Sequence, residues 1–158
     1  MIILGIDPGF ARMGVAILKK EKNKEGLVYS TCITSEPSEK NREKRLLVLA
    51  KELEQIILKY KPDILAIEKL FFFKNHKTVI QVAEAVGMIL FLCAQKGLSV
   101  KEFTPLQIKI ALTSYGRAEK SQVEKMVKAI LKLEKIPLLD DETDAIAVAL
   151  TCSAGIST

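Results

Sequence analysis

The sequence predicts an α/β domain whose core is a five-stranded mixed sheet with helices on both faces. Three short β-prone segments come first, and helical segments then alternate with two further strands. The segments around residues 2–7 and 63–69 are apolar on both faces, which is typical of strands buried between two helical layers. With 158 residues and 49% hydrophobic content, we expect residues 1–158 to form one domain.

The first three strands are expected to be antiparallel neighbours. IILGID, GVAILKK and LVYSTCI are short and rich in β-branched and other apolar residues. The dipeptide Pro8-Gly9 separates the first two, and the polar stretch EKNKEG separates the second from the third. Such turn residues between β-prone segments favour hairpin connections.

The remaining elements follow in alternation. RLLVLAKELEQIILKY, residues 45–60, has apolar residues at helical spacing and is ended by Lys61-Pro62. DILAIEK is a predicted buried strand, FFFKNHK a loop, and TVIQVAEAVGMILFLCAQK a long helix stopped by Gly97. LSVKEFT is the fifth strand. Three helices are predicted after it, in PLQIKIALT, AEKSQVEKMVKAILKL and DETDAIAVALTCSA.

Composition restricts the classes of function. The chain carries 24 Lys and Arg against 19 Asp and Glu, a net charge of +5, which favours an anionic partner such as nucleic acid. It has one histidine, so the sequence does not favour a multi-histidine metal site. Cys32, Cys93 and Cys152 are expected to be buried free thiols. The sequence shows no leader peptide and no membrane span, so we expect a cytoplasmic protein without membrane contact.

Two strands end on an acidic residue after a similar apolar run. ILGID ends at Asp7 and ILAIE ends at Glu68. If these strands are parallel neighbours, the carboxylates lie side by side at a strand spacing of about 4.8 Å. Asp141 and Asp144 are three residues apart at the start of a predicted helix, so they share one face.

Acids in a first helical turn often only cap the helix, and Asp140 and Glu142 fit that role. The other four acids predict a metal site. Ligands that are all oxygen suit Mg²⁺ or Mn²⁺ rather than zinc. Two divalent ions would neutralise four carboxylates and could clamp a phosphodiester during in-line displacement.

Four segments occur in an order that resembles the RuvC family of Holliday junction resolvases. They are IDPG with Gly14 downstream, AIEKLFFFKN, AEKSQVEKMV and DETDAIAVA, and the resemblance covers essentially the whole chain. It implies a ribonuclease H-like fold and a homodimer that cuts four-way DNA junctions with Mg²⁺ during recombination and repair. It also implies work alongside a branch-migration motor complex.

The resemblance assigns roles residue by residue. It implies that Asp7, Glu68, Asp141 and Asp144 bind metal and catalyse, and that Lys120 is catalytic or stabilises phosphate. Further DNA contacts are expected at Lys74, Lys109 and Arg117, and at Phe71 or Phe72, where an aromatic ring could stack on a base. The chain departs from the family at Phe10 and Met13, where small hydroxyl residues and Thr are frequent, and at Lys69, where Gln is common.

Other functions remain compatible with the sequence. A ribonuclease H-like nuclease of the YqgF type, acting on RNA, would share the fold and the carboxylates. A sugar-kinase or actin-like ATPase domain would use a similar Asp-x-Gly turn, although those proteins enclose the nucleotide between two such domains. A DNA-binding module without catalysis would leave the four carboxylates unexplained.

The long helix at 78–96 supplies a candidate dimer interface. Its predicted core stripe is wide, and Met88, Phe91 and Leu92 extend it further than a surface helix with one buried face requires. The predicted stripe consists of Val79, Val82, Ala83, Val86, Ile89, Leu90 and Cys93. Because a junction needs two matched nicks and the chain carries one set of acids, a two-fold dimer is expected.

Overall fold

The computed structural model describes residues 1–158 except 23, 37, 70–75, 134–137 and 157–158, and excludes the side chains of residues 76–78. Three strands come first: β1 (Ile2–Asp7), β2 (Arg12–Glu21) and β3 (Lys24–Thr34). Helix α1 (Arg42–Tyr60), strand β4 (Ile64–Glu68), helix α2 (His76–Gln95) and strand β5 (Ser99–Phe103) follow. Three helices complete the chain: α3 (Pro105–Thr113), α4 (Lys120–Leu131) and α5 (Asp140–Ala154).

The strands form one sheet in the order β3-β2-β1-β4-β5. β1 pairs antiparallel with β2, and β2 pairs antiparallel with β3, as the turn residues predicted. β4 pairs parallel with both β1 and β5. The predicted five-stranded mixed sheet is therefore confirmed, including the adjacency of the two strands that end in an acid.

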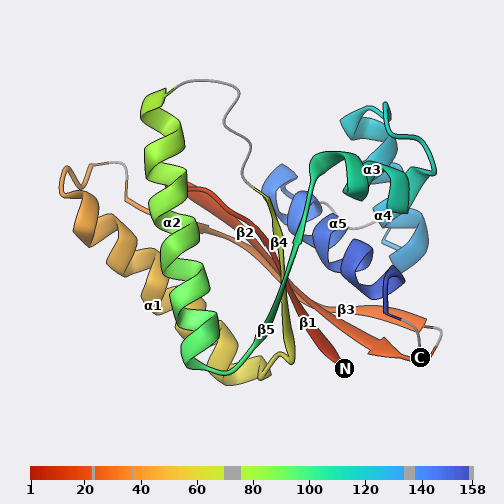
Figure 1. Ribbon diagram of the computed structural model, residues 1–158, viewed down its shortest axis with the longest axis horizontal. Helices are drawn as coiled ribbons and strands as arrows, with labels where there is room; N and C mark the ends of the chain where they lie inside the picture. Colours follow the sequence, from red (N-terminus) through yellow and green to blue (C-terminus); the bar gives the residue numbers. More distant parts are fainter. Residues whose placement is uncertain (23, 37, 70–75, 134–137, 157–158) are drawn as a thin grey trace.

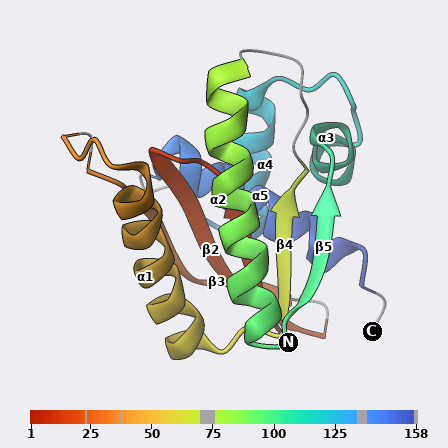
Figure 2. The same ribbon diagram turned by 60° about the vertical axis from the view of Figure 1, so that its left-hand side comes forward.

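Helices cover both faces of this sheet. Figures 1 and 2 show α1 and α2 on one face and α3, α4 and α5 on the other. Each face has its own apolar core. Leu4, Ile6 and Leu65 belong to the core beneath α1 and α2, whereas Ile3 and Ala66 belong to the core beneath α5. The alternation along β1 and β4 explains why both strands are apolar throughout.

The main differences from the predicted boundaries lie in the second hairpin and in α1. Pairing continues as far as Glu21 opposite Lys24, so most of the polar stretch EKNKEG belongs to the strands. Ladder hydrogen bonds outweigh the low β-propensity of Glu21, Lys24 and Glu25, because their side chains can remain in water. Helix α1 begins at Arg42, three residues before the predicted start.

The position of α2 corrects part of the predicted interface. Leu92 is buried in the core, and Met88 and Leu90 are partly buried against it. By contrast, Ile80 and Phe91 are 58% and 67% exposed. The outward apolar face of α2 is therefore rotated relative to the prediction, because the register of helix against sheet cannot be read from a broad apolar stripe.

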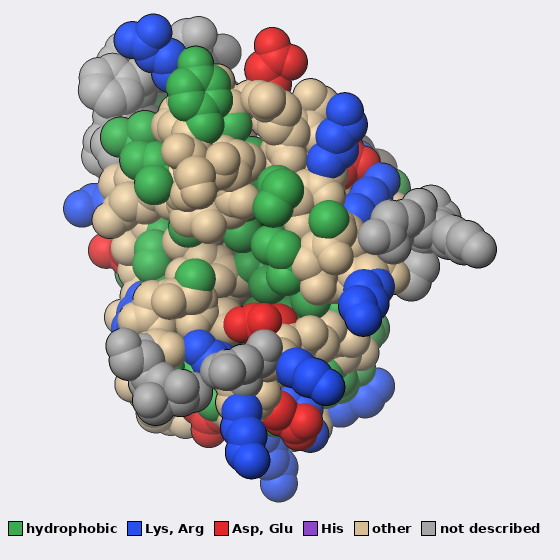
Figure 3. All heavy atoms as spheres, turned by 90° about the vertical axis from the view of Figure 1, so that its right-hand side faces the viewer, with side chains coloured by type: hydrophobic (Ala, Val, Ile, Leu, Met, Phe, Trp, Pro, Cys, Tyr) green, Lys and Arg blue, Asp and Glu red, His purple; other side chains and the backbone are tan. Residues whose placement is uncertain are grey.

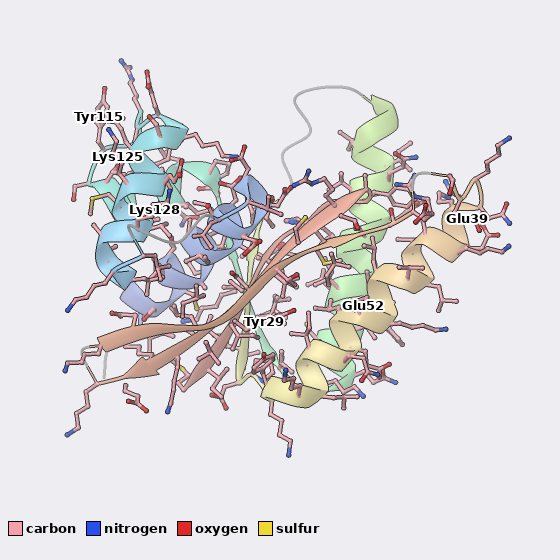
Figure 4. All side chains as sticks on the ribbon, turned by 180° about the vertical axis from the view of Figure 1, so that it is seen from behind. Tyr29, Glu39, Glu52, Tyr115, Lys125 and Lys128 are labelled. Atoms are coloured by element: carbon pink, nitrogen blue, oxygen red, sulfur yellow. The ribbon has the colours of Figure 1, made fainter. Side chains whose placement is uncertain are left out.

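Smaller features complete the fold. Tyr29 of β3 stacks on Tyr60 of α1 with ring centroids 5.2 Å apart, near Glu52 of the same helix (Figure 4). Cys93 and Cys152 are buried free thiols as expected, whereas Cys32 is only partly buried. No helix in the described part of the chain combines the length and the apolar character needed to cross a bilayer.

Candidate active site

Asp7 and Glu68 lie side by side where two parallel strands end. Ile6 of β1 is paired with Ile67 of β4, and each acid is the next residue along its strand. The apolar residues before them are buried in the two cores, so the main chain holds both carboxylates rigidly at one edge of the sheet. This adjacency was predicted from the runs ILGID and ILAIE.

Two glycines let α5 approach the sheet closely at this edge. A Cβ on Gly5 would lie 2.3 Å from the carbonyl oxygen of Ala145, and one on Gly14 would lie 1.9 Å from that of Asp141. Gly14 is the partner of Asp7 across the β1–β2 pair. The contact therefore brings the first two turns of α5, with Asp141 and Asp144, over the end of β1.

The carboxylates perturb one another. Burial, followed by the negative charges of Asp144, Glu68 and Asp141, raises the pKa of Asp7 to about 7 against the opposing effect of Lys120. Burial, followed by the charge of Asp144, also raises the pKa of Glu68. Acids that share one site cannot all ionise without positive charge nearby. The arrangement therefore favours the binding of a cation.

Two basic side chains already contact the acids of α5. Arg12, at the start of β2, donates a hydrogen bond to Asp141, and this bond raises the pKa of the guanidinium. Lys120, at the start of α4, lies 2.7 Å from an oxygen of Asp144 and 3.7 Å from one of Asp140. Burial lowers the pKa of Lys120, but the hydrogen bond to Asp144 and the surrounding acids raise it overall.

Asp140 and Glu142 lie in the first turn of α5, where they favour the helix dipole as predicted, but neither is the N-cap residue. The N-cap residue is Leu139, and no side chain caps it by a hydrogen bond. Glu142 instead accepts a 2.6 Å hydrogen bond from the hydroxyl of Ser30 on β3. The packing of α5 on the sheet turns this acid toward the neighbouring strand, which a helix-capping argument does not consider.

A cavity of about 220 Å³ opens beside the acids. Glu68 and Asp144 line it together with Lys109 and Lys120, and its other walls are apolar. Lys109 comes from α3 and Lys120 from α4, so both predicted lysines lie beside two of the predicted acids. Arg117 is exposed in the segment between these helices. Phe71, Phe72 and Lys74 lie outside the described residues.

The donor chemistry fits a hard divalent cation. All four predicted ligands are carboxylates, the preferred ligands of Mg²⁺ and Mn²⁺. Among the residues whose positions are described, no three acidic, histidine or cysteine side chains form a group close enough to hold a metal ion. Instead, Asp141 forms an ion pair with Arg12, and Asp144 forms one with Lys120. Sequence reasoning missed Arg12, because no local pattern links residue 12 to residue 141.

Three residues depart from the family pattern, and two of them are buried in the core while the third is exposed. Met13 is fully buried, and Phe10 is 5% exposed with the guanidinium of Arg45 over its ring. Lys69 is exposed, and its backbone N–H donates to the carbonyl of Phe103. These positions support the loop after Asp7 and the end of β4.

Comparison with known proteins gives consistent matches over almost the whole chain. Residues 3–152 match the family model described as crossover junction endodeoxyribonuclease RuvC. The RuvC proteins of Petrotoga mobilis and Ruminiclostridium cellulolyticum are each 49% identical over 150 residues, covering 94% and 95% of this chain and 91% and 90% of theirs. Thermus thermophilus RuvC superposes with a TM-score of 0.90 at 29% identity, covering 98% of this chain and 94% of that chain. The same protein in complex with a Holliday junction substrate also gives a TM-score of 0.90, at 28% identity and with 97% and 93% covered.

Proposed function

Because the chain belongs to the RuvC family of crossover junction endodeoxyribonucleases, it is a Holliday junction resolvase, and we propose that Asp7, Glu68, Asp141 and Asp144 form its catalytic centre. One observation carries the assignment. Two acids at the ends of parallel strands and two at the start of α5 come together, and burial, followed by the charges of the other three acids, raises the pKa of Asp7 to about 7. A cluster of this kind is costly for stability and is typical of a catalytic site.

Nucleases of this family depend on metal ions, and we propose Mg²⁺ as the ion, with two ions in each site and Mn²⁺ able to substitute. When bound, such ions would supply the charge that allows all four carboxylates to ionise and a phosphodiester anion to enter. The strand ends fix Asp7 and Glu68, whereas Asp141 and Asp144 depend on the seating of α5.

Lys120 is proposed to act on the scissile phosphate. Its side chain is 55% exposed, and its ammonium lies 2.7 Å from Asp144. The ammonium group is therefore not deeply buried, and it can stabilise negative charge beside the acids. Lys109 borders the same cavity and is proposed to contact a neighbouring phosphate. Arg117 is proposed to contact DNA further out, and Figure 3 shows basic side chains around the margins of the face that includes α3 and α4, with hydrophobic side chains in its middle.

The decisive experiment replaces each of the four acids singly by Asn or Gln. Each variant should lose cleavage of a labelled four-way junction in Mg²⁺ while retaining its fold and junction binding. Binding can strengthen, because an anion next to the DNA has been removed. Linear duplex and an RNA–DNA hybrid serve as competing substrates, and preferential cleavage of the hybrid would contradict junction resolution. Cleavage at the wild-type rate by any two of the variants would contradict the assignment of these four acids as the catalytic centre.

We further propose that the protein acts as a two-fold dimer through α2. Ile80, Gly87 and Phe91 lie on one side of the helix, at spacings of seven and four residues, and a Cβ on Gly87 would meet nothing within 4 Å. An exposed apolar face around a small residue suits close helix packing. One active site per subunit would then make the two matched nicks that a two-fold junction requires.

Phe91→Glu tests this interface. We expect the wild type to sediment at twice the mass of one chain at micromolar concentration, and the variant at the mass of one chain. The variant should also lose paired incision, because a monomer brings only one active site to the junction. Val100→Glu, at an exposed apolar position on β5, is the matched control and should remain dimeric. A wild-type monomer that makes two symmetric cuts would refute the dimer.

Two wider proposals rest on the family alone. The relatives are bacterial proteins that act on DNA, so we propose that residues 1–158 work as one catalytic domain in the cytoplasm. We also propose that a branch-migration motor complex acts on the same junction. Co-sedimentation of the protein with a motor-bound junction, compared with a bare junction, would test that association.

A further inference from the structure

The loop at residues 8–11 joins two parts of the candidate active site. Asp7 precedes the loop at the end of β1, and Arg12, the partner of Asp141, follows it at the start of β2. The turn is tight, because a Cβ on Gly9 would lie 1.9 Å from the carbonyl oxygen of Arg12. A change in the loop would therefore move both side chains relative to α5.

Ser35 holds this loop by hydrogen bonds to two successive carbonyl groups. Its hydroxyl donates to the carbonyl oxygen of Phe10 at 2.8 Å, and its backbone N–H donates to that of Ala11 at 3.0 Å. Ser35 is 1% exposed, so these bonds are shielded from water. A buried hydroxyl must be satisfied by the protein, and this one is satisfied by the loop.

Arg45 of α1 completes the contact from the other side. Its Nε donates to the Ser35 hydroxyl oxygen at 2.9 Å, and its guanidinium carbon lies 4.5 Å from the centre of the Phe10 ring. A serine hydroxyl has one proton and two acceptor sites. With Arg45 on an acceptor site, the proton is directed to Phe10. Arg45 therefore fixes the direction of the Ser35 bond and also holds the side chain of the loop residue.

We propose that Ser35 and Arg45 are positioning residues that hold the loop at residues 8–11, and through it Asp7 and Arg12, in the arrangement that cleavage requires. Neither contacts the four acids directly. They act by excluding other conformations of a short loop whose two ends carry parts of the site. This inference depends on the proposed catalytic role of Asp7.

The test uses the whole chain and compares Ser35→Ala and Arg45→Met with Arg42→Met. Arg42 is on the same helix and also makes one polar contact, with Glu84 at 3.1 Å, but that contact leads to α2. Four quantities are measured: the single-turnover rate of junction cleavage in Mg²⁺, junction affinity in Ca²⁺, the melting temperature, and amide hydrogen exchange at residues 9–12.

Ser35→Ala and Arg45→Met should each slow cleavage by about 10- to 100-fold, the range expected when a reacting group is misplaced by up to an ångström. Junction affinity should stay near that of the wild type, and exchange at residues 9–12 should accelerate. The loss of rate in the double variant should be smaller than the product of the two single losses, since both side chains share the Ser35 hydroxyl, while Arg45 also contacts the Phe10 ring. Ser35→Thr, which keeps the hydroxyl, should restore most of the rate, and Arg42→Met should cleave normally.

Three results would overturn the inference: cleavage at the wild-type rate by both single variants, a loss of affinity equal to the loss of rate, or an equal loss of rate in Arg42→Met. If Ser35→Ala does not fold, Arg45→Met and Arg45→Lys decide the question, because Arg45 is only partly buried. Asp7→Asn in the same assay separates the two proposals. Cleavage by Asp7→Asn would contradict the proposed site, whereas an inactive Asp7→Asn with normal Ser35→Ala and Arg45→Met would contradict the positioning role alone.

Discussion

Replacing Asp7 by Asn should stabilise the protein in EDTA, and the gain should be larger at pH 8 than at pH 4. Asp7 has its pKa raised from 3.8 to about 7 by burial and by the neighbouring acids. Between these values the folded state keeps a proton that the unfolded state releases, so raising the pH costs the wild type stability. The cost is complete above pH 7 and absent below the pKa of the unfolded chain. An asparagine at this position would not titrate and would not bear this cost.

The raised pKa sets the size of the effect. Raising the pKa of Asp7 from 3.8 to about 7 corresponds to about 4 kcal/mol of stability, which is an upper limit because part of the side chain faces solvent. A gain of about 2 kcal/mol would raise the melting temperature by roughly 4–8 °C at this chain length. The assay is urea unfolding in EDTA at pH 4, 6 and 8, with Glu102→Gln on β5 as an exposed control. An equal gain at all three pH values, or none at pH 8, would refute the reasoning.

Three other changes probe the surroundings of the site. Gly14→Ala should destabilise the fold by about 2 kcal/mol or more and slow cleavage, because the added methyl would collide with the backbone of Asp141. Gly26→Ala, where a Cβ meets nothing within 4 Å, should leave activity unchanged; equal unfolding midpoints for the two variants would contradict the close-approach argument. Lys20 Nζ donates at 2.7 Å to the carbonyls of both Ser153 and Ile156, at the end of α5 that is far from the acids. Lys20→Met should therefore lower the free energy of unfolding by about 1–3 kcal/mol in urea, without changing the cleavage rate. Lys109→Gln should weaken junction binding and lower the slope of log affinity against log salt by about one; an unchanged slope would remove Lys109 from the DNA interface.

Much of the site could be predicted because its parts follow local rules. An acid at the end of an apolar strand is visible in ILGID and ILAIE, and the shared face of Asp141 and Asp144 follows from helical spacing. The contacts between distant elements could not be predicted in the same way. Arg12 contacts Asp141, and Arg45 contacts Ser35, only because α5 and α1 pack at particular positions along the strands of the sheet.

The error at Leu92 has a related cause. Almost every position of α2 from Val79 to Cys93 is apolar or small, so the sequence does not identify which apolar side chains face the sheet. The structure buries Leu92 and leaves Phe91 exposed. The family resemblance supplied the family of the protein and the proposed roles of its lysines, because composition and spacing alone would have left these lysines as ordinary surface charge.

The late position of α5 in the chain has a consequence during synthesis. Residues 145–153 of this helix are all buried, and the same element supplies two of the four proposed catalytic acids. A ribosome-bound chain that has not yet released α5 therefore exposes one apolar face of its sheet and holds only Asp7 and Glu68. Such a nascent polypeptide is expected to need protection from aggregation, and with only two of the four proposed catalytic acids it is expected to be unable to cleave DNA. Completion of the hydrophobic core and the appearance of nuclease activity are thus expected to be a single event in the maturation of the enzyme.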